Sequence, residues 1–259
     1  MLVDGSARIL VDAGPGAFAR LGEARLTLSE TDIVLLTHLH VDHAGELPGL
    51  FKARAVSGGD SAVFNVWGPA GTGKPHEGAY FPSTSRFLEL LFGREGAFAY
   101  LQDFAASISL RAHDIPTRVR LNAQVIFAEG GLVIRAIAGH HGDAPAVIYR
   151  IDYAGKSITF SGDIDAKGLA GLRTIARESD LLVFNSVVLD PPGSPAILYT
   201  LHTPPRAIGE LARGAGVHNL LLSHISPAVE ENQEAVLDSI KRSYMGPVSI
   251  AADRLRVMP

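Results

Sequence analysis

The stretch THLHVDH at residues 37–43 places three histidines and an aspartate within six residues. It follows the apolar run IVLL at residues 33–36, whose length and composition predict a buried strand. The polar residues therefore form a loop at the carboxyl end of a strand, where α/β sheets usually carry their chemistry. Imidazoles and a carboxylate this close together favour a divalent metal, with zinc first and manganese or iron as alternatives.

The pattern around this loop predicts strands and helices in alternation. Strands are expected at residues 7–11, 33–36, 62–67, 107–110, 124–128, 132–138, 146–151, 157–160, 181–184, 219–222, 248–251 and 255–257. Helices are expected near Phe18 to Leu21 and at residues 44–51, 83–104 with a break near 93–96, 169–178, 203–214 and 231–242. No linker-like stretch divides the chain. We therefore expect an α/β (α+β) fold, one domain over residues 1–259 with two packed mixed sheets and outer helices.

The composition is that of a globular, core-forming protein. Of the 259 residues, 47% are hydrophobic and 19% are charged. The net charge of −4 predicts no electrostatic footprint for a polyanion, and a local basic patch is the alternative. The absence of cysteine excludes disulfides, thiolate ligands and a cysteine nucleophile, so a metal must be bound by histidines and carboxylates. No apolar run has the length of a membrane span, and we expect a cytoplasmic protein without a membrane partner.

Further ligand candidates follow other predicted strands. His140 and His141 come after the strand at 132–138, Asp163 after 157–160 and His224 after 219–222. A single histidine or aspartate at a strand end is commonly a cap or turn residue. Together with the loop at 37–43, however, these residues supply enough ligands for two metals.

The sequence HLHVDH at residues 38–43 matches the H-x-H-x-D-H signature of the metallo-β-lactamase superfamily, and Asp12, His141, Asp163 and His224 follow in that family's order. The chain resembles this superfamily over nearly its whole length. The resemblance implies an αββα sandwich with the site between the sheet edges. It also implies a ligand set of His38, His40 and His141 for one metal and Asp42, His43 and His224 for the other, with Asp163 bridging.

Two assignments have alternatives. His141 is preferred over His140 as the ligand, because HGDAPAVIYR at residues 141–150 resembles the run after that ligand in the ribonuclease Z and arylsulfatase-like branches. Asp12 would accept an N–H from a ligand histidine, or it is simply a turn residue before glycine.

The resemblance implies a hydrolase that uses a metal-bridging hydroxide as its nucleophile. Asp42 would orient this hydroxide and accept its proton. His202, in LHTPPRA at residues 201–207, resembles a histidine that acts on the leaving group in ribonuclease Z-like proteins; a surface histidine at a helix start is the alternative. The expected enzyme cleaves a phosphodiester or similar small ester. An arylsulfatase, a lactonase and a non-catalytic metal-binding protein are the other candidates.

Two departures bear on the substrate and partners. Ribonuclease Z has an arm that grips transfer RNA, whereas only a short hairpin separates His141 from Asp163 here. Residues 68–112 form an apolar, lid-like inserted segment instead. We therefore expect a small-molecule ester and not transfer RNA as the substrate. Relatives often dimerise, so a homodimer is an open alternative. We also expect the first sheet to have a shortened or missing amino-terminal edge strand.

Overall fold

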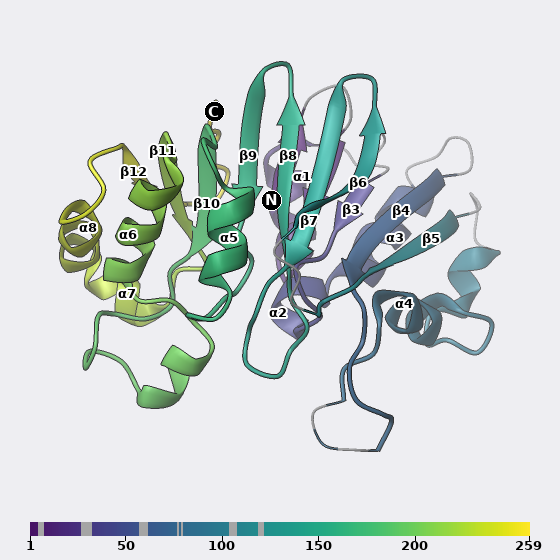
Figure 1. Ribbon diagram of the computed structural model, residues 1–259. Helices are drawn as coiled ribbons and strands as arrows, with labels where there is room; N and C mark the ends of the chain where they lie inside the picture. The colour runs from purple at the N-terminus through teal and green to yellow at the C-terminus, as the bar shows by residue number, and fades with distance from the viewer. Residues whose placement is uncertain are drawn as a thin grey trace. The chain divides into compact units, whose positions relative to one another are not determined.

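The computed structural model describes residues 1–4, 8–26, 33–56, 62–76, 78, 80–103, 108–118 and 122–259. The chain divides into two compact units, residues 1–116 and 117–259. Each unit has its own mixed β-sheet with helices (Figure 1). In Figure 1 the colour runs from purple to blue through the first unit and from teal to yellow through the second.

The first unit contains a five-stranded sheet in the order β1-β2-β3-β4-β5. The strands are β1 (Leu2–Asp4), β2 (Arg8–Val11), β3 (Ile33–Leu35), β4 (Ala62–Pro69) and β5 (Ile108–Ile115). Only the β1–β2 pair is antiparallel, and the other pairs are parallel. The helices are α1 (Ala17–Glu23), α2 (Val41–Ala44), α3 (Leu47–Val56), α4 (Thr84–Phe92) and the short 3-10 helix η1 (Ala99–Gln102).

One face of this sheet forms the core of the first unit. Alternate residues of a strand point to the same face, and Val34 and Leu36, like Phe64 and Val66, follow this period into one buried cluster. Helix α3 adds Phe51 to the cluster, and its ring lies 4.6 Å from that of Phe64. The parallel strands thereby place their carboxyl ends, including the loop after β3, at one edge of a buried sheet.

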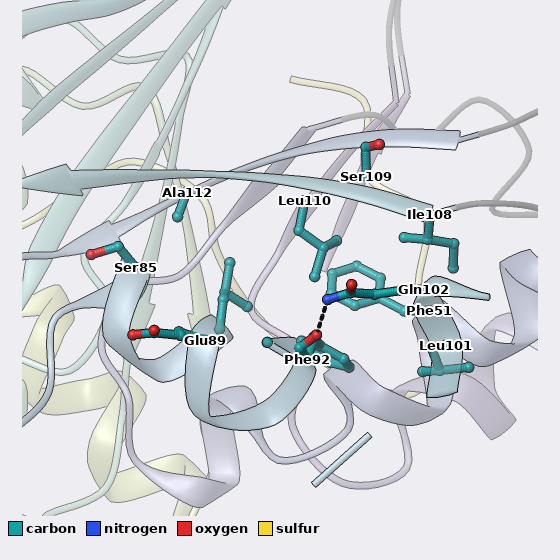
Figure 2. A pocket seen from close by; sticks show the side chains of 12 residues that line it. Phe51, Ser85, Glu89, Phe92, Leu101, Gln102, Ile108, Ser109, Leu110 and Ala112 are labelled. Atoms are coloured by element: carbon teal, nitrogen blue, oxygen red, sulfur yellow. Dashed lines mark hydrogen bonds between the residues drawn. The ribbon is translucent and has the colours of Figure 1, made fainter. Parts of the chain in front are cut away.

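The segment at 68–112 is partly integral to this unit. Strand β5 pairs with β4 along eight residues. Helix α4 is capped by Ser83, whose hydroxyl accepts a hydrogen bond from Arg86 N, and it buries Leu88 and Phe92 in the core. Between α4, η1 and β5 lies a cavity of about 540 Å³ (Figure 2). The apolar residues of this segment thus pack on the sheet, and its role as a lid stays a prediction.

The second unit contains a seven-stranded sheet in the order β12-β11-β10-β9-β8-β7-β6. The strands are β6 (Gln124–Glu129), β7 (Leu132–Ala138), β8 (Val147–Tyr153), β9 (Lys156–Phe160), β10 (Leu181–Asn185), β11 (Asn219–Ser223) and β12 (Val248–Ile250). The helices are α5 (Leu169–Ile175), η2 (Ala196–Thr200), α6 (Pro205–Ala215), α7 (Pro227–Glu231) and α8 (Gln233–Lys241). Strands β9 to β12 are parallel, and β6 to β9 are antiparallel.

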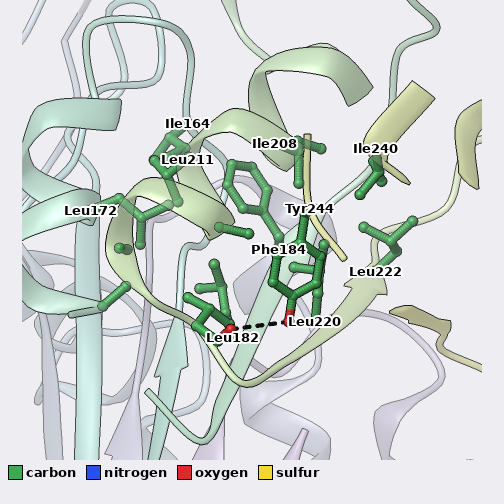
Figure 3. Packing of buried hydrophobic residues seen from close by; sticks show 14 of the residues in the cluster. Ile164, Leu172, Leu182, Phe184, Ile208, Leu211, Leu220, Leu222, Ile240 and Tyr244 are labelled. Atoms are coloured by element: carbon green, nitrogen blue, oxygen red, sulfur yellow. Dashed lines mark hydrogen bonds between the residues drawn. The ribbon is translucent and has the colours of Figure 1, made fainter. Parts of the chain in front are cut away.

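The core of the second unit lies between its parallel strands and its helices (Figure 3). Phe184 of β10 and Leu222 of β11 are fully buried in it with Ile208 of α6. Tyr244 is buried in the same cluster, and its hydroxyl donates to the carbonyl oxygens of Val217 and His218 at 3.1 and 2.8 Å. The buried hydroxyl therefore has acceptors, as a polar group in a core requires.

The predicted fold class is confirmed: the chain has two mixed sheets with helices. The expected strand at 255–257 is wrong, because Arg254 adopts a left-handed φ of 64° in a turn and leaves Leu255 and Val257 exposed. The edge strand β1 is present and is three residues long. The single domain over 1–259 stays a prediction. Among the described residues, no helix has the length and apolar character needed to cross a membrane.

Candidate metal centre

The predicted ligands fall into two sets, one in each unit. The first ligand set is His38, His40, Asp42 and His43, between β3 and α3. The second ligand set is His141, Asp163 and His224, in three separate loops, with His202 before α6. All of these residues lie within the described part of the chain.

The first ligand set results from a short extended segment followed by a helical turn. Residues two apart in an extended segment point to the same side. Accordingly, His38 Nε2 lies 3.0 Å from His40 Nδ1. Helix α2 starts after His40, and its turn brings the ring of His43 to 4.0 Å from that of His38. Asp42 is on the exposed side of α2, with its carboxylate 3.6 Å from His43 Nε2.

Asp12 holds the first ligand set in place. Its carboxylate accepts hydrogen bonds of 2.8 Å from Thr37 N, Thr37 Oγ1 and His43 Nδ1. Because a carboxylate only accepts, His43 Nδ1 carries the hydrogen and Nε2 is the nitrogen available for a metal. The turn after Asp12 packs on the same loop: a Cβ at Gly14 would overlap the carbonyl oxygen of Asp42. Asp12, whose backbone has a left-handed φ of 57°, is thus a hydrogen-bond partner of His43.

The second ligand set lies at one edge of the second sheet. Strand β7 runs parallel to β9, since each is antiparallel to β8, and β9, β10 and β11 are parallel. The carboxyl ends of these strands therefore meet at one edge, where His141, Asp163 and His224 follow β7, β9 and β11. Asp163 Oδ2 lies 4.0 Å from His141 Nε2 and 3.4 Å from His224 Nε2.

Local backbone and hydrogen bonds fix the two histidines of this set. His141 Nδ1 donates to the carbonyl oxygen of Leu201 at 2.8 Å, which leaves Nε2 available for a metal. His224 has a left-handed φ of 53°, an uncommon conformation for a residue with a Cβ. Such strained positions concentrate at functional sites.

The adjacent His140 has a different partner. Its Nδ1 lies 2.7 Å from Asp165 Oδ2, and the Asp165 carboxylate accepts the hydrogen bond. His141, and not His140, is the histidine close to Asp163. The assignment of His141 as the ligand stays a prediction, and this geometry supports it.

His202 also lies beside Asp163, with Nδ1 3.7 Å from Oδ2. Its side chain is only 8% exposed, so the alternative of a surface histidine is wrong. Asn185, at the end of β10, places Nδ2 2.9 Å from His202 Nδ1. The sequence analysis missed Asn185, although a polar residue that closes the apolar strand LLVF is a usable signal.

The donor sets suit a divalent metal. They offer the imidazoles of His38, His40, His43, His141 and His224 and the carboxylates of Asp42 and Asp163. Nitrogen and oxygen donors without thiolates suit zinc, manganese or iron. The 3.0 Å between the His38 and His40 nitrogens is close to the ~3.3 Å expected for two nitrogens on one tetrahedral zinc. His141, Asp163 and His202 also form a group whose ligand atoms lie within 4.8 Å of one another.

This fold and this donor chemistry define a superfamily. The family model described as "Beta-lactamase superfamily domain" matches residues 7–225, so the chain belongs to the beta-lactamase superfamily. Ribonuclease Z from Mycobacterium sp. (strain KMS) is 27% identical over 240 residues, which cover 89% of this chain and 78% of the relative. The predicted relationship to the ribonuclease Z branch is thereby confirmed.

Two solved structures share the fold. The short form of human tRNase Z has a TM-score of 0.73 at 18% identity and covers 98% of this chain and 89% of its own. Zinc-bound PqqB from Methylobacterium extorquens has a TM-score of 0.64 at 14% identity, with 98% and 85% covered. The prediction of a metal-dependent hydrolase of ester bonds is confirmed by the superfamily match and by the relatives named ribonuclease Z.

The expectation that transfer RNA is not a substrate is wrong. It is contradicted by relatives named ribonuclease Z that align over most of the chain. The hairpin of β8 and β9 between His141 and Asp163 is indeed short. The net charge of a whole chain does not describe the charge of its local faces, and a short hairpin between two ligand candidates does not exclude an RNA substrate.

Proposed function

We propose that the chain is a hydrolase of phosphodiester bonds that depends on two divalent metal ions. His38, His40 and His141 would hold one ion, Asp42, His43 and His224 the other, and Asp163 both. The observation that carries the proposal is the position of Asp163 Oδ2, at 3.4 to 4.0 Å from imidazole nitrogens of His141, His202 and His224. Three histidines from three loops have no structural need to surround one carboxylate in this way.

Metal ions at such a site lower the pKa of a coordinated water and offset the negative charge that develops on phosphate oxygens. Asp42 would accept a proton from the attacking water, since its exposed carboxylate adjoins His43 Nε2. His202 would donate a proton to the departing oxygen. Asn185 would hold the ring of His202 in position through Nδ1, and His202 Nε2 would then face the substrate.

We further propose RNA as the substrate, with precursor transfer RNA included. The relatives named ribonuclease Z and the structural neighbour named tRNase Z support this class. A small phosphodiester uses the same chemistry and provides a simpler probe. Sulfate esters and lactones are the competing substrates.

The test combines metal content with a substrate panel. Protein purified with zinc or manganese is analysed for bound metal and assayed on precursor transfer RNA, an activated phosphodiester, a sulfate ester and a lactone. We expect two ions per chain and turnover of the phosphodiesters. Fewer than one ion per chain, or turnover restricted to the sulfate ester or the lactone, would contradict the proposal.

The role of His202 is tested with a matched histidine variant. His202→Ala should lower kcat about 10²–10⁴-fold with metal content retained, the range for loss of a general acid. His218→Ala is the control, because His218 is an exposed histidine that also adjoins two carboxylates, Glu178 and Asp180, at 3.8 Å. Equal turnover of the two variants would refute the assignment of His202 as the proton donor to the departing oxygen.

A further inference from the structure

Hydrogen bonds join the three loops of the second unit that carry His141, Asp163 and His202. His141 Nδ1 donates to Leu201 O at 2.8 Å, which ties the first loop to the third. Thr203 Oγ1 donates to Ile164 O at 2.9 Å, which ties the third loop to the second. The remaining side of this triangle, between the first and second loops, is formed by His140 and Asp165.

The His140–Asp165 contact is reciprocal. His140 Nδ1 donates to Asp165 Oδ2 at 2.7 Å, and Asp165 N donates to His140 O at 2.9 Å. The other carboxylate oxygen of Asp165 accepts from Lys167 N at 2.8 Å. Asp165 is only 5% exposed, so its carboxylate has little contact with water and these donors satisfy it instead. Hydrogen bonds to a carboxylate are stronger than those between neutral groups.

The position of this pair in the sequence gives it a consequence for the ligands. His140 is the neighbour of His141, and Asp165 lies two residues after Asp163. The two loops also pack closely, since a Cβ at Gly168 would lie 3.2 Å from His140 N and 3.0 Å from Ile164 Cβ. A change in the distance between His140 and Asp165 would therefore also change the distance between His141 Nε2 and Asp163 Oδ2, which is 4.0 Å here.

We propose that His140 and Asp165 form a latch that sets the spacing of the metal ligands His141 and Asp163 before a metal binds. They are positioning residues and bind no metal themselves. His140 Nδ1 donates its hydrogen to Asp165, so the pair affects the metal ligands by positioning the backbone and not by contacting the ion. The proposal rests on the proposed function only in taking His141 and Asp163 as ligands.

The test measures metal affinity, independently of turnover. His140→Ala, Asp165→Asn and the double variant are stripped of metal, and the Kd for zinc is measured by competition with a chelating dye. Loss of a residue that orients a ligand typically weakens metal binding about 10–100-fold. We expect His140→Ala to weaken zinc binding by a factor in this range, with two ions still bound at saturation. Asp165→Asn should weaken zinc binding less, because an amide oxygen can still accept the hydrogen bond from His140 Nδ1. The double variant should bind zinc about as weakly as His140→Ala, because without the imidazole the residue at position 165 has no Nδ1–H bond left to lose.

Asp180→Asn is the matched control. Asp180 also accepts several hydrogen bonds, from Ser157 N, Ser157 Oγ and Lys156 Nζ, but it joins β9 and β10 at their amino-terminal ends. This variant should lower the melting temperature of the metal-free protein without changing the Kd. The latch is refuted if His140→Ala keeps the wild-type Kd, or if its Kd changes only as much as that of Asp180→Asn. Loss of one ion per chain in His140→Ala would instead make His140 a ligand and overturn the proposal. If the wild-type chain binds no zinc, the proposed function fails, which is a distinct outcome.

Discussion

Replacing Asp12 with asparagine should damage the first ligand set far more than its small change in shape suggests. Asp12 Oδ1 accepts from Thr37 N, and Oδ2 accepts from both Thr37 Oγ1 and His43 Nδ1. An asparagine has one oxygen and one NH₂ group. If its oxygen faces Thr37 N, its NH₂ faces His43 Nδ1; if it is turned around, the NH₂ faces the N–H of Thr37. One donor loses its acceptor in either orientation.

The magnitude follows from these contacts. A buried donor left without an acceptor costs about 1–3 kcal/mol, and the remaining bonds lose the strength that the charge gave them. We expect Asp12→Asn to lower the free energy of unfolding by about 2–4 kcal/mol, or the melting temperature by roughly 5–12 °C. With NH₂ facing Nδ1, His43 would carry its hydrogen on Nε2. Zinc affinity should then fall about 10–100-fold.

Asp114→Asn in the same unit is the control for this experiment. Asp114 accepts from Ser85 N at 2.8 Å and Ser85 Oγ at 2.5 Å, the same pair of donor types, but it is exposed and these bonds involve no histidine. Its loss should cost under about 1 kcal/mol, because water replaces the contacts. Melting temperature and zinc Kd are measured for both variants. The reasoning is refuted if Asp12→Asn binds zinc as tightly as Asp114→Asn.

Two further predictions concern stability. Gly14→Ala should lower the melting temperature, because the added Cβ overlaps with Asp42 O at a cost of about 1–3 kcal/mol. Gly22→Ala in α1 should not destabilise the chain, because its added Cβ meets no atom within 4 Å. Thermal unfolding of both variants tests this, and equal melting temperatures would contradict it. Burial raises the pKa of Tyr244 to about 12 from 10. The unfolded chain therefore ionises first, and the stability that this shift contributes is present below pH 10 and is lost as the pH rises toward 12, by roughly 3 kcal/mol at most. Urea unfolding at pH 9 and 11 should show this loss in the wild type and less of it in Tyr244→Phe; the same loss in both would exclude Tyr244 as its source.

The sequence predicted the fold class and the candidate ligands for a physical reason. A regular apolar period predicts a strand, and polar residues directly after it are visible in the sequence. These local signals suffice to predict neighbouring ligands where parallel strands bring their carboxyl ends to one edge of a sheet. His141, Asp163 and His224 became candidates in this way, and the preference for His141 over His140 came from the family resemblance. The strand at 255–257 was predicted from Leu255 and Val257, but after the turn at Arg254 both side chains are exposed and the segment pairs with no strand in the described part of the chain.

The partners of the ligands could not be predicted from local patterns, and only for Asp12 did the family resemblance suggest a hydrogen bond from a ligand histidine. Asp12 and His43 are 31 residues apart, His140 and Asp165 are 25 apart, and His141 and Leu201 are 60 apart. These contacts join loops whose approach depends on strand order, which no local pattern specifies. Asn185 is a similar case, since its contact with His202 spans 17 residues.

The two ligand sets differ in what holds them, and this difference predicts where substitutions will act. His43 depends on the side chain of Asp12, so one substitution removes its partner. His141 depends on the backbone carbonyl of Leu201, which no side-chain substitution removes. Neighbours that move the backbone can therefore still shift its position, and the contact between His140 and Asp165 lies next to it in the chain. Leu201→Ala should consequently leave zinc affinity nearly unchanged, while Asp165→Asn, at a residue that is no ligand, should weaken it.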